Sequence, residues 1–227
     1  DQDDRWYPDK LERLVPLLDD AVLCSARWRV VDAARSATPP RRRHGFSLAG
    51  VLAQNPVPGA AMVFRRTLLD WALPFPDSAA PTAAHDHWLL ACAAAVDSCP
   101  VSPDVLQDYV QHGGNVIGHE RQGGIVDPLR TRFSWTLRRA RHPRRLVAEA
   151  ERLSFGWRRV MAQALAERLT AADLHEHGPT LRAYAGARRL PVYRELARSC
   201  YRGDLRFPTA LTFVVGSFPG ATDSGER

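Results

Sequence analysis

The sequence predicts an α/β fold over residues 1–124, followed by a mostly helical, basic region over residues 125–227. Three observations predict it. Short strand-like runs alternate with helix-like runs in the first region, as in layered α/β architectures. Apolar residues recur at three- and four-residue steps in the second region, as on one face of a helix. Hydrophobic residues make up 45 % of the 227, which is enough for a sizeable core.

Five segments carry the α/β prediction, in chain order. Residues 21–33 (AVLCSARWRVVDA) have the β-branched composition of a strand, and residues 59–64 (GAAMVF) are typical of a short buried strand. A helix is expected from about residue 65 to residue 72. Residues 85–96 (HDHWLLACAAAV) predict a buried helix, and residues 101–112 (VSPDVLQDYVQH) predict a strand.

The second region predicts helices and carries a strongly basic stretch. Pro143 suits the first turn of a helix. The apolar face that follows it consists of Leu146, Ala150, Leu153, Trp157, Val160, Ala164 and Leu165. Residues 130–145 contain seven arginines and no acid, so they either form an exposed helix face or dock on anionic lipid headgroups. Nucleic-acid binding is the weaker alternative, because no nucleic-acid-binding module is recognisable.

Charge and cysteine content bound the class of protein. The formal net charge is +6 and the pI about 9.6, and nearly all of the cationic residues are arginines, which suit phosphate and carboxylate partners. Four cysteines without a CxxC pair predict reduced, mostly buried thiols in a cytoplasmic protein. The apolar run 207–220 is too short and too rich in Pro and Gly to span a bilayer. Peripheral contact with the inner face of the plasma membrane is a further expectation.

The first residues form a cluster of carboxylates. Asp1 and Asp3 are separated by one residue, and Asp4 follows directly. Two such side chains can point at one hard divalent cation, Mg²⁺ or Mn²⁺, which prefers oxygen ligands. Taken alone, such a pair is more often a solvated turn or a helix cap. Asp9 is better interpreted as the N-cap or a first-turn residue of a helix.

Four motifs in one order strengthen the metal-site interpretation. They are DQDDRWYPDKLE (1–12), NPVPGAAMVFRRTLLDWALPFP (55–76), HDHWLLACAA (85–94) and YVQHGGNVIG (109–118). Together they resemble the family 2 glycosyltransferases of GT-A fold, in particular the bacterial rhamnosyltransferase-like members. The likeness covers residues 1–118. Arg5 departs from it, because that position is usually apolar in the family.

The resemblance implies a role for individual residues. Asp1 and Asp3 would hold the divalent metal, His112 would complete the metal site or touch the diphosphate, and Asp86 would be the catalytic base. His85 and His87 could also be a zinc pair, but a structural role is preferred, and Asn115 is expected to orient its loop or bind substrate. The residues expected at the donor and acceptor pockets are Asp4, Trp6, Gly59, His85, Trp88 and Asn115.

The implied reaction explains these residue types. A sugar leaves a nucleotide diphosphate when the charge developing on the diphosphate is stabilised, which a carboxylate-held metal can do. A positioned carboxylate activates the acceptor hydroxyl as a general base. The expected partners are a nucleotide-diphosphate sugar, rhamnose being one candidate sugar, and a glycan or lipid-linked acceptor. Inversion at the anomeric carbon is implied by the family.

The position of the carboxylates adds one more expectation. In the family this motif follows a nucleotide-binding half, so the chain resembles the C-terminal part of a transferase, with roughly 90 residues of strands and helices expected before it at ~30 residues per βαβ unit. The alternative function is a non-catalytic, truncated transferase that binds a membrane or a partner through its basic helices.

Overall fold

The computed structural model describes residues 4–31, 37–38, 46–77, 84–110, 155–186 and 188–203, together with residues 205, 207, 210, 211 and 214. These residues belong to two compact units. Unit 1 comprises residues 4–31, 37–38, 46–51, 55–75 and 84–110, and unit 2 comprises residues 52–54, 76–77 and those from 155 onward. Strands and helices both occur, so the predicted mixed α/β class is confirmed.

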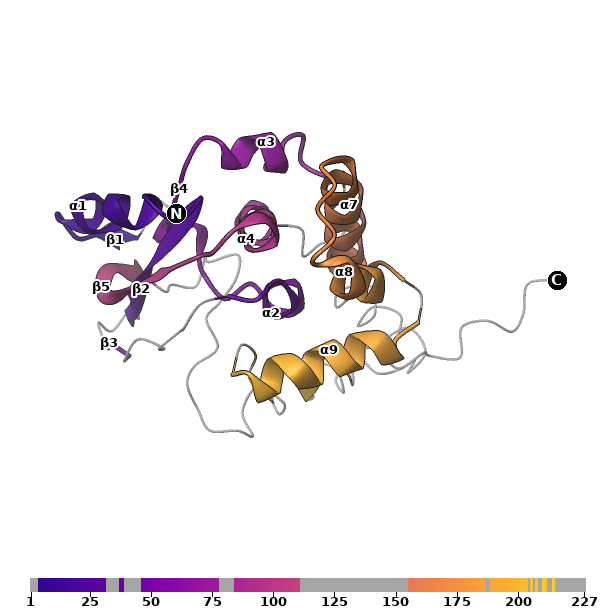
Figure 1. Ribbon diagram of the computed structural model, residues 1–227. Coiled ribbons are helices and arrows are strands. Elements are labelled where there is room, and N and C mark those ends of the chain that lie inside the picture. The colour runs from indigo at the N-terminus through magenta and orange to yellow at the C-terminus, as the bar shows by residue number, and fades with distance from the viewer. Residues whose placement is uncertain are drawn as a thin grey trace. The chain divides into compact units, whose positions relative to one another are not determined.

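Unit 1 is built on a mixed β-sheet (Figure 1). Strands β1 (Arg5–Trp6), β5 (Val101–Val110), β2 (Leu23–Val31) and β3 (Ala37–Thr38) are neighbours in that order, and β4 (Met62–Phe64) also pairs with β2. β2 and β5 run parallel, whereas β1–β5, β2–β3 and β2–β4 are antiparallel. The two long parallel strands therefore form the centre of the sheet.

The sequence of β2 explains its central place. Its first four residues, Leu23 to Ala26, are all buried, which is expected of a strand that is covered on both faces. Trp28 is buried as well, while the last residues of the strand become partly exposed. Burial therefore fixes the first half of β2 most firmly.

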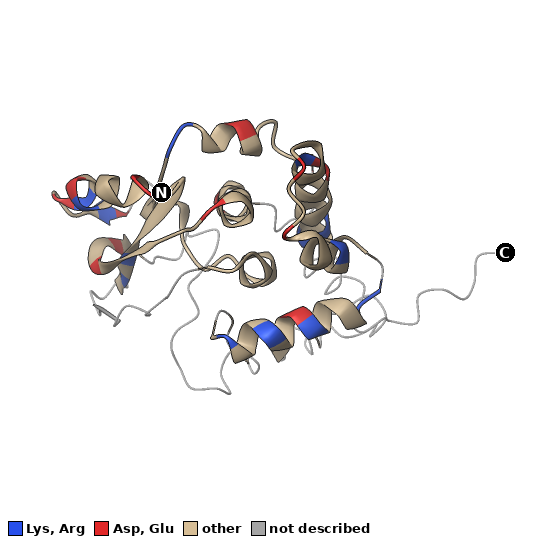
Figure 2. Cartoon of the chain, in the orientation of Figure 1, with Lys and Arg blue, Asp and Glu red and all other residues tan. Residues whose placement is uncertain are grey.

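Six helical segments begin in unit 1. They are α1 (Lys10–Leu14), the 3₁₀ turn η1 (Val15–Leu18), α2 (Leu48–Ala53), the 3₁₀ turn η2 (Gly59–Ala61), α3 (Leu68–Ala72) and α4 (His85–Val96). In α4 every residue from His87 to Ala95 is buried. A helix that is apolar all round belongs to a core. Figure 2 shows correspondingly little charge on α2 and α4.

Most of the strands and helices predicted for unit 1 are confirmed. The helix over residues 85–96 has the predicted bounds, and β2 and β5 lie inside the predicted strands. The prediction of a strand over all of 59–64 is wrong for its first half, because Ala61 N–H bonds to the Pro58 carbonyl at 2.9 Å and closes a 3₁₀ turn. The next helix starts at Leu68 rather than 65, because Arg65 N–H still bonds to the Val22 carbonyl at 2.8 Å.

The described part of unit 2 is mainly helical, as predicted. Its helices are α7 (Trp157–Ala171), α8 (Gly178–Ala185) and α9 (Leu190–Tyr201). Four buried residues of α7 recur at every fourth position, which is the spacing of one helix face; they are Trp157, Met161, Leu165 and Leu169, and Ala162 beside them is buried too. Residues 143–154 of the expected helix and the basic stretch 130–145 lie outside the described residues.

Within the described residues, no helix combines the length and the apolar character that crossing a bilayer requires.

The four thiols should differ in reactivity. Cys24, Cys92 and Cys99 are buried, whereas Cys200 is partly exposed. Burial raises the pKa of Cys24 to about 11 and that of Cys99 to about 12, so few thiolates form there near neutral pH. A disulfide reagent such as DTNB should therefore titrate one thiol quickly in the folded protein and all four after denaturation. Cys200→Ser should remove the fast phase, and a second fast thiol in the folded protein would contradict the packing.

Candidate functional site

The described candidate site residues all belong to unit 1 and come from three segments. Asp4 lies just before β1, and Trp6 lies in that strand. Gly59 is the first residue of η2, and His85 and Asp86 lie in the first turn of α4. Asp4, Gly59 and Asp86 are partly exposed, while Trp6 and His85 are exposed. Asp1, Asp3, His112 and Asn115 lie outside the described residues.

The carboxylate of Asp86 is held by two backbone donors. Gly59 N–H donates to Oδ2 at 3.2 Å, and His87 N–H donates to Oδ1 at 2.7 Å. The helix N-terminus also favours a negative charge in this first turn. Because each carboxylate oxygen has a second lone pair, Asp86 can accept a further hydrogen bond from a molecule that reaches its partly exposed side.

The close approach of η2 to α4 favours a glycine at position 59. A Cβ atom added there would lie 3.1 Å from Asp86 Cβ and 3.3 Å from His85 Nε2. Contacts of that length are tighter than ordinary van der Waals packing, so a side chain at position 59 would force Asp86 or His85 to shift by a few tenths of an ångström. The glycine therefore lets the turn lie against the first turn of α4.

Trp88 and His87 point into the core rather than toward Asp86. Trp88 is fully buried, and its indole N–H donates to the Ala72 carbonyl at 2.8 Å. His87 is buried too, and its Nε2 lies 2.6 Å from the Val51 carbonyl oxygen. The structure therefore does not bring Trp88 together with the exposed site residues. The side chains of His87 and Trp88 instead anchor α4 to the core.

The segments that lead to the expected metal ligands are joined by a hydrogen bond. Val110 N–H donates to Asp4 Oδ1 at 3.2 Å. β1 pairs with β5 in the register Arg5 to Asp108 and Trp6 to Gln107, so the start of β1 meets the end of β5. Asp4 and Val110 thus lie side by side at one end of the sheet.

Lys10 lies between three of these segments. Only 1 % of it is exposed, and its Nζ donates to the Ala60 carbonyl of η2 and to Gln107 Oε1 of β5, the latter at 2.6 Å. The ammonium also lies 3.7 Å from the centre of the Trp6 ring, which is a favourable cation–π geometry. The sequence analysis missed this residue, and the one signal for it was that Lys10 is the only lysine in the chain.

A second polar cluster on β5 was also missed. Arg29 donates from Nε and Nη2 to the two oxygens of Asp108 at 2.8 and 2.9 Å, and Tyr7 Oη donates to Asp108 Oδ1 at 3.0 Å. The hydrogen bond from Arg29 is the main reason that the pKa of Asp108 is lowered. Burial, followed by the bond to Asp108, raises the pKa of Tyr7. This cluster joins Tyr7, the residue that follows β1, to β2 and β5.

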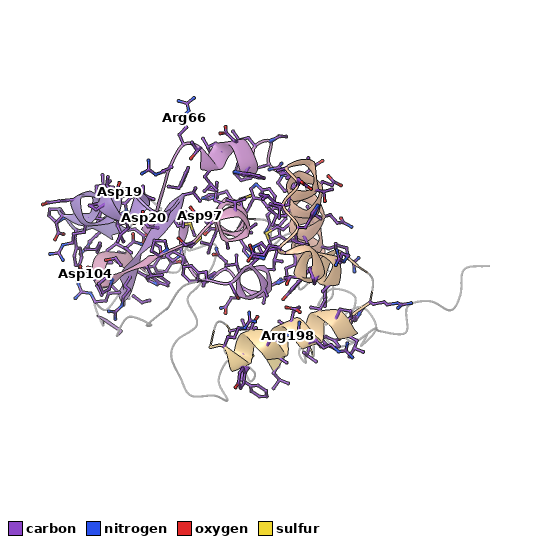
Figure 3. All side chains as sticks on the ribbon, viewed as in Figure 1. Asp19, Asp20, Arg66, Asp97, Asp104 and Arg198 are labelled. Atoms are coloured by element: carbon purple, nitrogen blue, oxygen red, sulfur yellow. The ribbon has the colours of Figure 1, made fainter. Side chains whose placement is uncertain are left out.

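Other carboxylates of unit 1 have structural partners. Three of them, Asp19, Asp97 and Asp104, are labelled in Figure 3. Asp97 accepts a hydrogen bond from Val22 N–H at 3.0 Å. Asp104 forms an ion pair with Arg13 at 2.8 Å. Asp19 lies 3.6 Å from an Arg65 nitrogen. Asp9 is the N-cap residue of α1, as expected, but its carboxylate pairs with Arg13 instead of capping the helix.

Among the described residues, no group of three or more His, Cys, Asp or Glu side chains is arranged to hold a metal ion.

Comparison with known proteins gives no match for this chain, whether against protein-family models, curated proteins or solved structures.

Replacing Gly59 should be costly. Gly59→Ala is expected to lower the free energy of unfolding by about 1 kcal/mol, because the added methyl overpacks the contact with Asp86 and His85. Gly178→Ala is the matched control, since its Cβ would meet only the flexible end of the Arg182 side chain. Urea unfolding of both variants measures the difference. An equal effect of the two substitutions would argue against a close approach at Gly59.

The amine of Lys10 should make stability depend on pH. Burial lowers its pKa from 10.5 to about 8, although the Asp4 carboxylate opposes the shift. Between these values the unfolded chain binds more protons than the folded one, so stability rises with pH. Between about pH 7 and about pH 10, the free energy of unfolding of the wild type should rise by about 2 kcal/mol relative to that of Lys10→Met. Unfolding free energies of both proteins across this range test it, and a constant difference would contradict the lowered pKa.

Proposed function

We propose that the chain is part of a metal-dependent, inverting glycosyltransferase of family 2, and that unit 1 belongs to a GT-A domain. The enzyme transfers a sugar, rhamnose being one candidate, from a nucleotide diphosphate to a glycan or lipid-linked acceptor. The observation that carries the proposal is the carboxylate of Asp86, which is partly exposed and aimed by the Gly59 N–H at the start of a buried helix.

Asp86 suits the role of general base because its two known partners are both donors. Neither backbone N–H competes with it for a proton, and each carboxylate oxygen keeps a lone pair with which it can accept a bond from the acceptor hydroxyl. The acceptor hydroxyl gives its proton to Asp86 while its oxygen forms a bond to the anomeric carbon. The bond from that carbon to the diphosphate oxygen breaks, and the nucleotide diphosphate leaves with the electron pair. A single displacement of this kind inverts the anomeric centre.

Asp1, Asp3 and His112 would hold the Mg²⁺ or Mn²⁺ ion, and their carboxylate and imidazole groups are suitable ligands. The hydrogen bond between Asp4 and Val110 supports this assignment. In the sequence, Asp3 directly precedes Asp4, and His112 follows Val110 by two residues. When bound, the cation offsets the negative charge that develops on the leaving diphosphate.

The remaining motif residues would shape the pockets. Trp6 is 53 % exposed, so its indole can contact a sugar ring or a nucleotide base. Asp4 lies two residues before Trp6, and His85 directly precedes Asp86. Trp88 supports α4 from the core, and Asn115 stays a predicted contact outside the described residues. Cytoplasmic location, with residues 130–145 on an anionic inner leaflet, is the corresponding proposal for where the enzyme works.

The proposal is tested by Mn²⁺ titration followed by the electron paramagnetic resonance signal of the free ion, with and without UDP, TDP or GDP. Asp3→Asn should weaken Mn²⁺ binding at least about tenfold, since it removes a charged ligand. Asp86→Asn should leave Mn²⁺ binding unchanged but lower the rate of sugar transfer by about 10²- to 10⁴-fold. Asp20→Asn, an exposed aspartate of the same unit, is the control and should change neither.

The same titration separates the enzyme from the alternative, a non-catalytic protein that binds a membrane or partner through its basic helices. That alternative predicts no Mn²⁺ binding that depends on Asp3. Transfer activity that survives in Asp86→Asn would contradict the assignment of the base.

A further inference from the structure

The ammonium of Lys10 occupies a place in which each of its donors has a partner. A buried lysine is costly unless its charge and its N–H groups are satisfied. Here Nζ faces the Ala60 carbonyl, Gln107 Oε1 and the Trp6 ring. Three donors thus meet two oxygens and one aromatic face, which matches the number of protons on an ammonium group.

The partners of Lys10 come from segments that are far apart in the sequence. Ala60 is 50 residues away and Gln107 is 97 residues away. Trp6 and Gln107 are also directly opposite each other in the β1–β5 register. The side chain of Lys10 in α1 therefore joins the turn η2 to the two strands β1 and β5.

The contact with Ala60 matters because of its neighbour in the chain. Gly59, the preceding residue, donates its N–H to Asp86. Holding the Ala60 carbonyl fixes the orientation of the turn, and a 3₁₀ turn of three residues has few other bonds to resist rotation. The path from Lys10 to the Asp86 carboxylate thus contains one carbonyl, one short turn and one N–H group.

We propose that Lys10 is a positioning residue for the candidate site, which fixes η2 against β5 and thereby keeps the Gly59 N–H aimed at the Asp86 carboxylate. An arginine would not replace it, because a planar guanidinium does not fit where a compact ammonium donates in three directions. The positioning of the turn does not depend on the reaction, but its effect on turnover rests on the proposed function.

The test is hydrogen exchange of backbone amides, measured by NMR on the full chain. In Lys10→Met, the Gly59 amide should exchange at least about tenfold faster, because the turn opens locally, while amides in the middle of α4 change much less. Lys10→Arg should not restore protection. Arg13→Met, on the same helix with exposed ion pairs, is the matched control and should leave the Gly59 amide unchanged.

Uniform acceleration of all amides in unit 1 would overturn the proposal, because it would show that Lys10 acts through global stability alone. If Lys10→Met does not fold, Gln107→Met removes one of the two oxygen partners and should accelerate Gly59 selectively. Unchanged protection of Gly59 in that variant would overturn the proposal too.

A second measurement connects the turn to the reaction. With the transferase activity in hand, Lys10→Met should lower kcat while Mn²⁺ binding stays as in the wild type, and Lys10→Arg should not rescue kcat. If Gly59 exchange responds as expected but no transfer activity exists in the wild type, the proposed function fails and the positioning role stands. A wild-type kcat in Lys10→Met would overturn the role of Lys10 in turnover.

Discussion

The candidate site depends on the register between β1 and β5. This pairing sets Trp6 opposite Gln107, and both side chains then meet the ammonium of Lys10. The same register leads Asp4 to the N–H of Val110. A slip by one residue would turn every side chain of the short strand to the other face, so both contacts would be lost together. Two paired residues of β1 therefore determine where two of the motifs meet.

Helix α4 contributes rigidity in a different way. His87 and Trp88 anchor its first turn from the inside, through the carbonyls of Val51 and Ala72, while His85 and Asp86 in the same turn stay accessible. A functional carboxylate is most reproducibly placed when the element that carries it is locked by packing and by hydrogen bonds of its neighbours. The buried side chains of α4, together with these two hydrogen bonds, thus fix the place of its first turn.

Sequence reasoning succeeded where local pattern decides structure. The long apolar run of α4 gave its bounds, and the β-branched runs located β2 and β5. It failed at η2, where a proline and a glycine replace the expected strand by a turn, and it overlooked Lys10 and Asp108. The partners of these two residues lie tens of residues away, so no local spacing announces them. Asp86 was predicted because it lies within a motif that resembles one of the family, whereas its hydrogen bond from Gly59 became visible only in the fold.

The burial of Lys10 has a practical consequence for surface chemistry. It is the only lysine among 31 cationic residues, and almost none of it reaches solvent. Cross-linkers and labels that attack side-chain amines therefore find no exposed target among these 227 residues while the protein is folded. Cross-linking of this protein to its binding partners has to use arginines, carboxylates or the partly exposed thiol of Cys200 instead.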